Sequence, residues 1–270
     1  MRLSFAIAFA SLLAGCTTTF AEPRILVSPY LAIYRLRGNV GMQSSPAPGA
    51  PLQDNSRQSL GNFGQNQFSE DLGIRADLGD GFAGLRLDYL RLDQSTTRSG
   101  VLDANWGRLQ AGDPARISST MDELRLGWLE PVWSPRMMWR DRPLQFRFAA
   151  GGVLTHRDLT MRASTTDGAR SQKLDITGDT AAIATRMRAS WRDATFDLEY
   201  ALSPNLAIGD YGQLQQDLEA RLSYTLPLHD VTFFGGYRYS RIHASSRFDG
   251  FANDAELVLE GWQFGITVTF

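Results

Sequence analysis

The sequence predicts an all-β protein: a transmembrane antiparallel up-and-down β-barrel of about ten strands (8–12). Three observations lead to this prediction. Apolar and polar residues alternate through most of the chain, short and long connections alternate between these segments, and the last segment ends on an aromatic residue, Phe270. Alternation with a period of two indicates strands that bury one face. About ten such segments in series indicate a single large sheet that closes on itself.

The alternation is clear in residues 82–93, where Leu85, Leu87 and Tyr89 are interleaved with Arg86 and Asp88. Nine further segments show the same pattern: 24–37, 68–78, 121–130, 144–154, 183–191, 196–202, 218–226, 231–240 and 262–270. In the first of these both faces carry apolar residues, with Leu31 and Ile33 on one face and Tyr30 and Tyr34 on the other. The sequence therefore does not decide which face of this segment points outward.

The connections between these segments alternate in length. Short ones are expected at 79–81, 192–193 and 227–230, with a medium one at 131–143. Longer polar stretches are expected as loops at 38–66, 93–117, 156–178, 203–213 and 243–255. Transmembrane barrels have tight periplasmic turns and long outer loops. The pattern thus places the short turns and both termini in the periplasm and five loops outside.

The polar face carries arginines and carboxylates in nearly equal number, and Lys173 is the only lysine. Arginine stays charged when desolvated and forms forked pairs with carboxylates, so we expect a charge network that plugs the lumen. Its expected members are Arg75, Arg86, Asp88, Glu123, Arg125, Arg147, Arg186, Arg188, Asp197, Glu199, Asp217, Glu219, Arg221 and Arg238. A barrel of about ten strands is narrow enough for side chains to fill, so no wide pore is expected.

The opposite face carries aromatic residues near the strand ends, which suit the interfacial girdles of a membrane barrel. They are Tyr89, Trp128, Trp191, Tyr200, Tyr224, Tyr237 and Trp262. An alternative remains open, because a soluble, lipocalin-like barrel would place the apolar face inward and the charged face in water. The girdles and the bias towards arginine favour the membrane barrel.

The N-terminus has the pattern of an export signal. Arg2 is followed by an apolar stretch, Leu3 to Ala14, that is too short to span a bilayer. Two processing sites compete: cleavage after Ala21, or cleavage before Cys16, which would then be lipidated. We therefore divide the chain into a signal peptide, 1–21, and a single barrel domain, 22–270.

Composition excludes several functions. The chain has 270 residues and a formal net charge of −2, which gives no indication of a nucleic-acid partner. Three histidines and one cysteine do not provide a metal centre of the usual ligand spacing. The sequence also lacks a phosphate-binding loop and a convincing dinucleotide motif. We expect no cofactor and no metal.

Together, the export signal, the alternating segments from Arg24 onward and the final GWQFGITVTF resemble small bacterial outer-membrane β-barrel proteins. In that family a terminal strand with alternating aromatic residues is recognised by the barrel-assembly machinery. Trp262, Phe264 and Phe270 match that pattern. The resemblance implies the cell outer membrane as location, and outer-membrane lipid, lipopolysaccharide and the assembly machinery as partners.

The last hairpin more weakly resembles the lipid A deacylases, outer-membrane barrels with a His-x-Ser pair and a glutamate that face lipid. His243, Ser245 and Glu256, or alternatively Glu260, match, and the resemblance implies base, nucleophile and orienting carboxylate. The chain departs from that family in its strand number and in Ser246, where an asparagine is usual. Outer-membrane proteases of the omptin family have an aspartate pair and an Asp/His pair at the outer rim. We find no clear aspartate pair in this sequence.

The sequence therefore favours a non-enzymatic role. The long outer loops suit a structural or recognition function, or passage of a small solute. Two alternatives remain: a lipid A acyl hydrolase at the outer rim, and a soluble lipocalin-like carrier in the periplasm.

Overall fold

The computed structural model describes residues 24–45, 51–63, 65–95, 98–203, 213–227, 230–248 and 250–270. The expected signal peptide, 1–21, and the alternative lipidation site, Cys16, lie outside the described residues. Within those described ranges, no helix is both long enough and apolar enough to cross a membrane.

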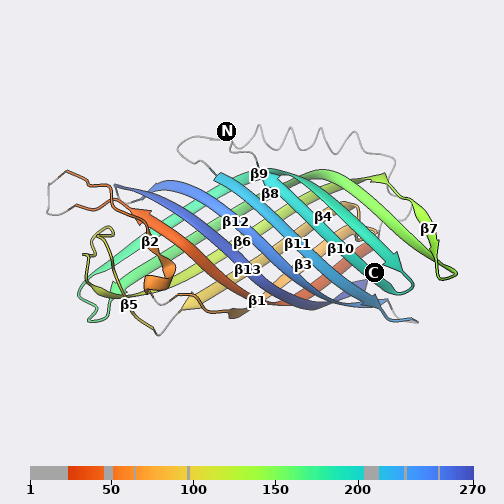
Figure 1. The fold of residues 1–270 in the computed structure, drawn as a ribbon, viewed down its shortest axis with the longest axis horizontal. Helices are drawn as coiled ribbons and strands as arrows, with labels where there is room; N and C mark the ends of the chain where they lie inside the picture. Colours follow the sequence, from red (N-terminus) through yellow and green to blue (C-terminus); the bar gives the residue numbers. More distant parts are fainter. Residues whose placement is uncertain are drawn as a thin grey trace.

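Ten long strands form a closed ring (Figure 1), and each pairs antiparallel with its neighbours. They are β1 (Arg24–Met42), β3 (Ser69–Gly79), β4 (Gly84–Ser95), β6 (Pro114–Trp133), β8 (Arg142–Thr165), β9 (Ser171–Trp191), β10 (Ala194–Ser203), β11 (Gln213–Thr225), β12 (Val231–Phe248) and β13 (Phe251–Thr269). Shorter elements are β2 (Gln58–Ser59), β5 (Gly100–Val101), β7 (Arg136–Trp139) and a 3₁₀ turn, η1 (Leu60–Phe63). The predicted up-and-down barrel of about ten strands is confirmed.

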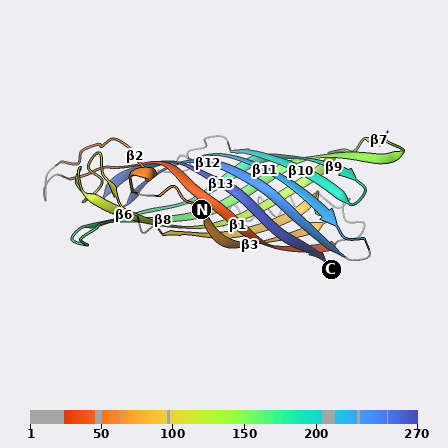
Figure 2. The same cartoon turned by 60° about the horizontal axis from the view of Figure 1, so that its bottom comes forward.

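The C-terminal strand closes the ring. β13 pairs with β1 from Leu26 opposite Thr269 to Met42 opposite Asn253. The Phe270 amide donates to the Ile25 carbonyl at 2.9 Å. Figure 2 shows the C-terminus at the same end of the barrel as β7. The chain therefore ends at the rim that also carries the short turns.

In the half of the barrel near these turns, apolar side chains point outward. On β1 the outward apolar residues run from Ile25 to Ile33, close to the roughly 9–11 residues that a tilted strand needs to span a bilayer. Leu31 is 37% exposed, whereas Tyr30 is 3% exposed and points into the lumen. The outward face of the first strand is therefore the aliphatic face with Leu31 and Ile33, and the tyrosines point into the lumen.

In the outer half the pattern inverts. On β8 Leu154 lies on the outward face, but Leu159 and Met161 point inward and are buried. Inward-facing apolar residues fill this half of the barrel: Leu36, Val40, Met42, Leu90, Leu92, Ile117, Met121, Leu159, Met161, Leu174, Ile176, Ile242, Leu257 and Leu259. The outward positions there are polar, as at Asp158 and Thr177. The outer half thus has the surface and core of a protein in water.

This inversion explains why two of the expected loops are wrong. Residues 156–178 and 243–255 are mostly strand, and the connections shrink to 166–170 and 249–250. Where the apolar residues move from the outward to the inward face, the period-two pattern loses its phase and resembles a loop. The expected loop at 203–213 lies almost wholly outside the described residues.

The two remaining outer connections, 43–68 and 96–113, are long and fold over the outer mouth. They carry β2, η1 and β5 and contribute buried apolar side chains to the outer core. The rings of Phe63 and Trp106 meet edge to face, with centroids 5.8 Å apart. These side chains pack with inward-facing residues of the barrel wall and form an apolar cap at the outer mouth.

The expected medium connection at 131–143 also proves to be mostly strand. β6 continues to Trp133, and β7 then pairs with the beginning of β8, joined to it by a two-residue turn at Arg140 and Asp141. This hairpin projects from the end of the barrel that carries the short turns (Figure 1).

A charge on the lipid-facing surface should destabilise the barrel according to its height. Leu87 lies outward on β4, between Leu85 and Tyr89, and is 44% exposed. Leu87→Arg should lower the free energy of unfolding by about 2–4 kcal/mol, because an arginine deep in the hydrocarbon loses its hydration. Urea unfolding of the protein in lipid vesicles measures this change.

The matched control is Ser118→Arg, on the neighbouring strand β6 and outward in the polar outer half. It should change the free energy by no more than about 0.5 kcal/mol. Equal losses for the two variants would contradict the assignment of the inner half to the bilayer.

Candidate functional site in the lumen and on the outer face

Arg75 of β3 lies at the centre of the lumen and joins opposite walls. Its guanidinium donates to Asp88 Oδ2 on β4 at 2.9 and 2.7 Å. It also donates to both carboxylate oxygens of Glu219 on β11, at 2.9 and 3.0 Å. Tyr30 adds a hydrogen bond to Asp88 at 2.8 Å, and Gln263 adds one to Glu219 at 2.8 Å. This cation is therefore held from both sides: it makes a forked, two-oxygen pair with Glu219, the strongest geometry available to arginine, and two hydrogen bonds to one oxygen of Asp88.

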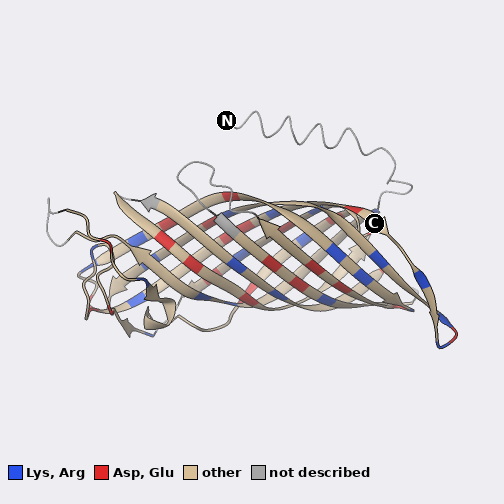
Figure 3. Ribbon diagram, turned by 45° about the horizontal axis from the view of Figure 1, so that its top comes forward, with Lys and Arg blue, Asp and Glu red and all other residues tan. Residues whose placement is uncertain are grey.

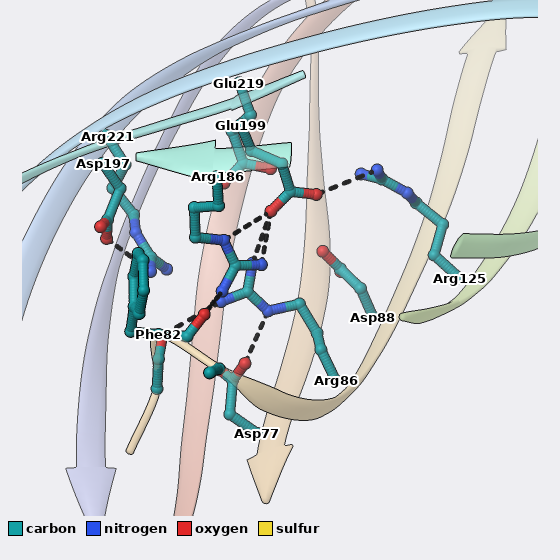
Figure 4. A network of polar contacts seen from close by, with 12 residues as sticks. Asp77, Phe82, Arg86, Asp88, Arg125, Arg186, Asp197, Glu199, Glu219 and Arg221 are labelled. Carbon is teal, nitrogen blue, oxygen red and sulfur yellow. Dashed lines mark hydrogen bonds and ion pairs between the residues drawn. The ribbon is translucent and has the colours of Figure 1, made fainter. Parts of the chain in front are cut away.

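A second group lies nearer the inner end (Figure 4), where two arginines share Glu199 of β10. Arg86 of β4 contacts Glu199 at 3.1 Å and Asp77 at 2.6 Å. Arg186 of β9 donates to the same glutamate at 2.9 Å and to the Phe82 carbonyl at 2.6 Å. The turn that carries Phe82 is thereby tied to the far wall of the barrel.

Three further groups complete the network. Asp197 of β10 pairs with Arg188 of β9 at 2.6 Å and with Arg221 of β11 at 3.2 Å. Arg125 of β6 lies 3.6 Å from Glu199 and 3.5 Å from Asp217.

The last group is centred on Glu123 of β6, whose carboxylate forms ion pairs with Arg238 of β12 and with Arg157 of β8. Figure 3 shows basic and acidic positions on neighbouring strands along the barrel wall.

The structure places all fourteen expected lumen residues on the inward face. Arg147 differs in being less buried, since it lies near the inner rim and pairs there with Asp80. Sequence reasoning missed Arg157 as a member of the network, because it fell within a stretch interpreted as a loop. The available signal was its parity, which it shares with Arg147 and with the apolar residues that follow it on β8.

The network leaves little free space in the lumen. A small cavity of about 20 Å³ lies among Arg75, Arg86, Arg125 and Glu199, enough for about one water molecule. Together with the apolar cap at the outer mouth, these side chains occupy the described lumen at two levels.

The proposed His243, Ser245 and Glu256 group lies outward on β12 and β13, above the aromatic girdle. His243 is directly opposite Glu256 in the strand register, with its Nε2 3.4 Å from the carboxylate. Ser245, however, is opposite Asp254. Among the described residues, no hydrogen bond joins the Ser245 hydroxyl to His243. The nucleophile and the base are therefore not brought together.

The carboxylate of Glu256 is engaged by arginines instead. Arg241 of β12 donates to one of its oxygens, and Arg57 lies 3.4 Å from the other. The hydrogen bond from Arg241 lowers the pKa of Glu256. A carboxylate held in this way is a poor orienting group for a catalytic histidine. The alternative partner, Glu260, is likewise held by Arg35 at 2.6 Å and by Arg37 at 2.8 Å.

A second histidine lies in a similar position on the opposite wall. His156 of β8 faces outward with its Nδ1 2.7 Å from Asp179 of β9. Both side chains are exposed, and within the described chain no group of three or more His, Cys, Asp or Glu residues is arranged to hold a metal ion. This pair alone provides neither a metal site nor a nucleophile.

The terminal-strand residues Trp262, Phe264 and Phe270 all point outward and are exposed, at 51%, 48% and 75%. Trp262 packs edge to face against Tyr237 at 5.1 Å and lies at the upper boundary of the apolar band. Phe270 lies at its lower boundary. The strand therefore presents one continuous apolar face from boundary to boundary.

No family model and no curated protein matches the sequence. Among solved structures, the chain is similar to the outer membrane protease OmpT from Escherichia coli, with 13% identity over 94% of this chain and 99% of that one and a TM-score of 0.40. It is also similar to the attachment invasion locus protein Ail of Yersinia pestis (10% identity, 92% and 99% covered, TM-score 0.31) and to the P. putida toluene transporter TodX (8% identity, 93% and 91% covered, TM-score 0.27).

These proteins are outer-membrane β-barrels, but such low TM-scores carry no argument about this chain. Its class rests on its own strand pairing and surface. It is a ten-stranded transmembrane β-barrel with a network of paired charges in its lumen.

Removing Arg75 should be costly, because Asp88 and Glu219 would stay buried without their shared cation. Arg75→Ala should lower the free energy of unfolding by about 3–5 kcal/mol. Tyr30→Phe, which removes one hydrogen bond to Asp88, should cost about 1 kcal/mol. Both values are measurable by urea unfolding in lipid vesicles.

Arg91→Ala is the matched control, since Arg91 is exposed on the outward face of β4. Its effect should stay within about 0.5 kcal/mol. If Arg75→Ala were as mild as this control, the lumen network would not stabilise the barrel.

Proposed function

We propose that this protein is an integral protein of the outer membrane with a structural or recognition role, and that it does not form a pore. The observation that supports this most strongly is the filling of the described lumen, with an arginine–carboxylate network below and an apolar cap above. The outward apolar band, bounded by Tyr237 and Trp262 at the top and Phe270 at the bottom, matches the surface that a membrane barrel presents to lipid.

The outer half supports a recognition role. On β8 the strand continues for about ten residues beyond Leu154, which corresponds to roughly 25 Å of projection for a tilted strand. Its core is apolar and its outer surface carries both charge signs, as at Asp158, Arg162 and Lys173. A rigid, well-packed projection of this kind holds a binding surface clear of the membrane.

Lipopolysaccharide is the lipid partner that fits the boundary. Arg35, Arg37, Arg57 and Arg241 lie on one side of the barrel just above the girdle and are between 33% and 49% exposed. These arginines pair with Asp254, Glu256 and Glu260, but each guanidinium has five N–H donors. Arginine binds phosphate as it binds carboxylate, so the remaining donors suit the phosphates of an outer-leaflet lipid. The exposed aromatic residues of β13 suit the assembly machinery that would insert the barrel.

The proposal predicts a membrane protein without a channel. The folded protein should cofractionate with outer membranes, resist carbonate extraction and run faster on gels before heating than after. In planar bilayers it should give no steady conductance. Carbonate release without a heat shift would contradict membrane insertion, and a stable porin-like current would contradict the proposal that the lumen forms no pore.

A lipid A acyl hydrolase remains the second candidate, because His243 faces Glu256 on the lipid side. The separation of Ser245 from this pair argues against it. We therefore expect Ser245→Ala to leave the acyl pattern of lipid A unchanged, as measured by mass spectrometry of lipid A from cells that express either form. A difference in acyl chains between the two strains would restore the enzyme hypothesis.

The two other roles considered from the sequence fit the geometry less well. A lipocalin-like carrier needs an apolar ligand cavity inside and a polar surface outside, whereas here the inner half is reversed. Passage of a small solute needs a continuous path, and the described lumen is filled.

A further inference from the structure

The hairpin of β7 and the start of β8 carries an apolar face and an unusual group of cations. Two tryptophans meet there edge to face, Trp139 of β7 and Trp191 of β9, with ring centroids 5.3 Å apart. The Arg140 guanidinium lies 5.0 Å from the centroid of Trp139, and that of Arg192 lies 4.5 Å from the centroid of Trp191. Arg142 is paired with Trp139 across the hairpin.

These three arginines differ from those of the lumen. In the described part of the chain, none of them forms an ion pair with a carboxylate, and the acidic residues of the two turns, Asp141 and Asp193, leave the group with a net positive charge. Guanidinium groups seated on aromatic faces keep donors free for an anion. The arrangement therefore presents positive charge beside exposed apolar rings.

The backbone at two of these arginines is left-handed. φ is +49° at Arg140 and +55° at Arg192, and Asp141 between the hairpin strands has +58°. Turns of this kind favour glycine or asparagine, because a side chain on the Cβ crowds the backbone. An arginine costs backbone strain at such a position, and strained residues are enriched at functional sites.

The apolar part of the hairpin is continuous with the lipid-facing band. Trp133 stacks on Phe148 at 5.3 Å and is 61% exposed, and Met137 of β7 is 54% exposed. Pro131 lies near the end of β6 and Pro135 just before β7, and both lack the amide needed to pair with an added strand. The exposed rings and thioethers of this surface suit a lipid interface.

We infer that Arg140, Arg142 and Arg192, with Trp139 and Trp191, form a binding site for the headgroup of an anionic phospholipid in the inner leaflet of the membrane. This inference rests on the proposed membrane insertion. The tryptophans lie at the depth where indole rings are favoured, and the arginines reach the phosphate level below the acyl chains. The headgroup phosphate accepts hydrogen bonds from the guanidinium groups, and the Trp139–Trp191 pair contacts the first part of the chains.

The test uses native mass spectrometry of the full-length protein from micelles that contain equal amounts of phosphatidylglycerol and phosphatidylethanolamine with the same acyl chains. The wild type should retain phosphatidylglycerol in preference. The triple variant Arg140→Gln, Arg142→Gln, Arg192→Gln should lose about tenfold in that preference. The control Arg91→Gln, Arg116→Gln, Arg162→Gln, which neutralises three exposed outward arginines of the outer half, should retain it.

A single substitution separates binding from folding. Arg140→Gly suits the left-handed backbone, so it should fold at least as well as the wild type and still retain less phosphatidylglycerol. Equal retention of the two lipids by the wild type, or unchanged retention by the triple variant, would overturn the inference. A heat-shift assay on the wild type is read separately, because its failure would overturn membrane insertion itself.

Discussion

The structure depends on one constraint: the inner half of the barrel is apolar outside, so its polar side chains must find partners inside. The ion pairs of Arg75 with Asp88 and Glu219 meet that constraint at the centre of the lumen. Each buried charge loses its hydration, and only a partner with good geometry offsets the loss. Since Arg75 and Glu219 come from walls on opposite sides, the same pairs also hold the cross-section of the barrel in one shape.

The outer half solves the opposite problem. Here the surroundings are aqueous, so leucine, isoleucine and methionine turn inward and the charges turn outward. The chain makes this change within single strands, as on β8 between Leu154 and Leu159. The boundary between the two regimes is marked by aromatic and charged residues at the same height, among them Trp262 and Glu260. The inner half of such a barrel is anchored in the membrane, and its outer half projects into water.

Both candidate sites follow from this division. The charges in the lumen pair with one another, as Arg75 does with Asp88 and Glu219. Charges on the outer face are also paired, as Glu256 is with Arg241, so His243 and Ser245 remain a resemblance in sequence without the geometry of a triad. The arginines of the β7 hairpin are different because they lie beside aromatic rings at a rim, with no carboxylate partner of their own among the described residues.

The sequence by itself determined the fold, the inward set of charges and the closing role of the last strand, because a period of two is a local property of the chain. It also supplied His243, Ser245 and Glu256 as candidates, but only the strand register showed His243 opposite Glu256 and Ser245 opposite Asp254. It did not reveal the extent of β8, β9, β12 and β13, because the reversal of the apolar face imitates a loop. Which arginine meets which carboxylate was decided only by the tertiary structure: Arg75 and Glu219 are 144 residues apart, and the closure of the ring brings them together.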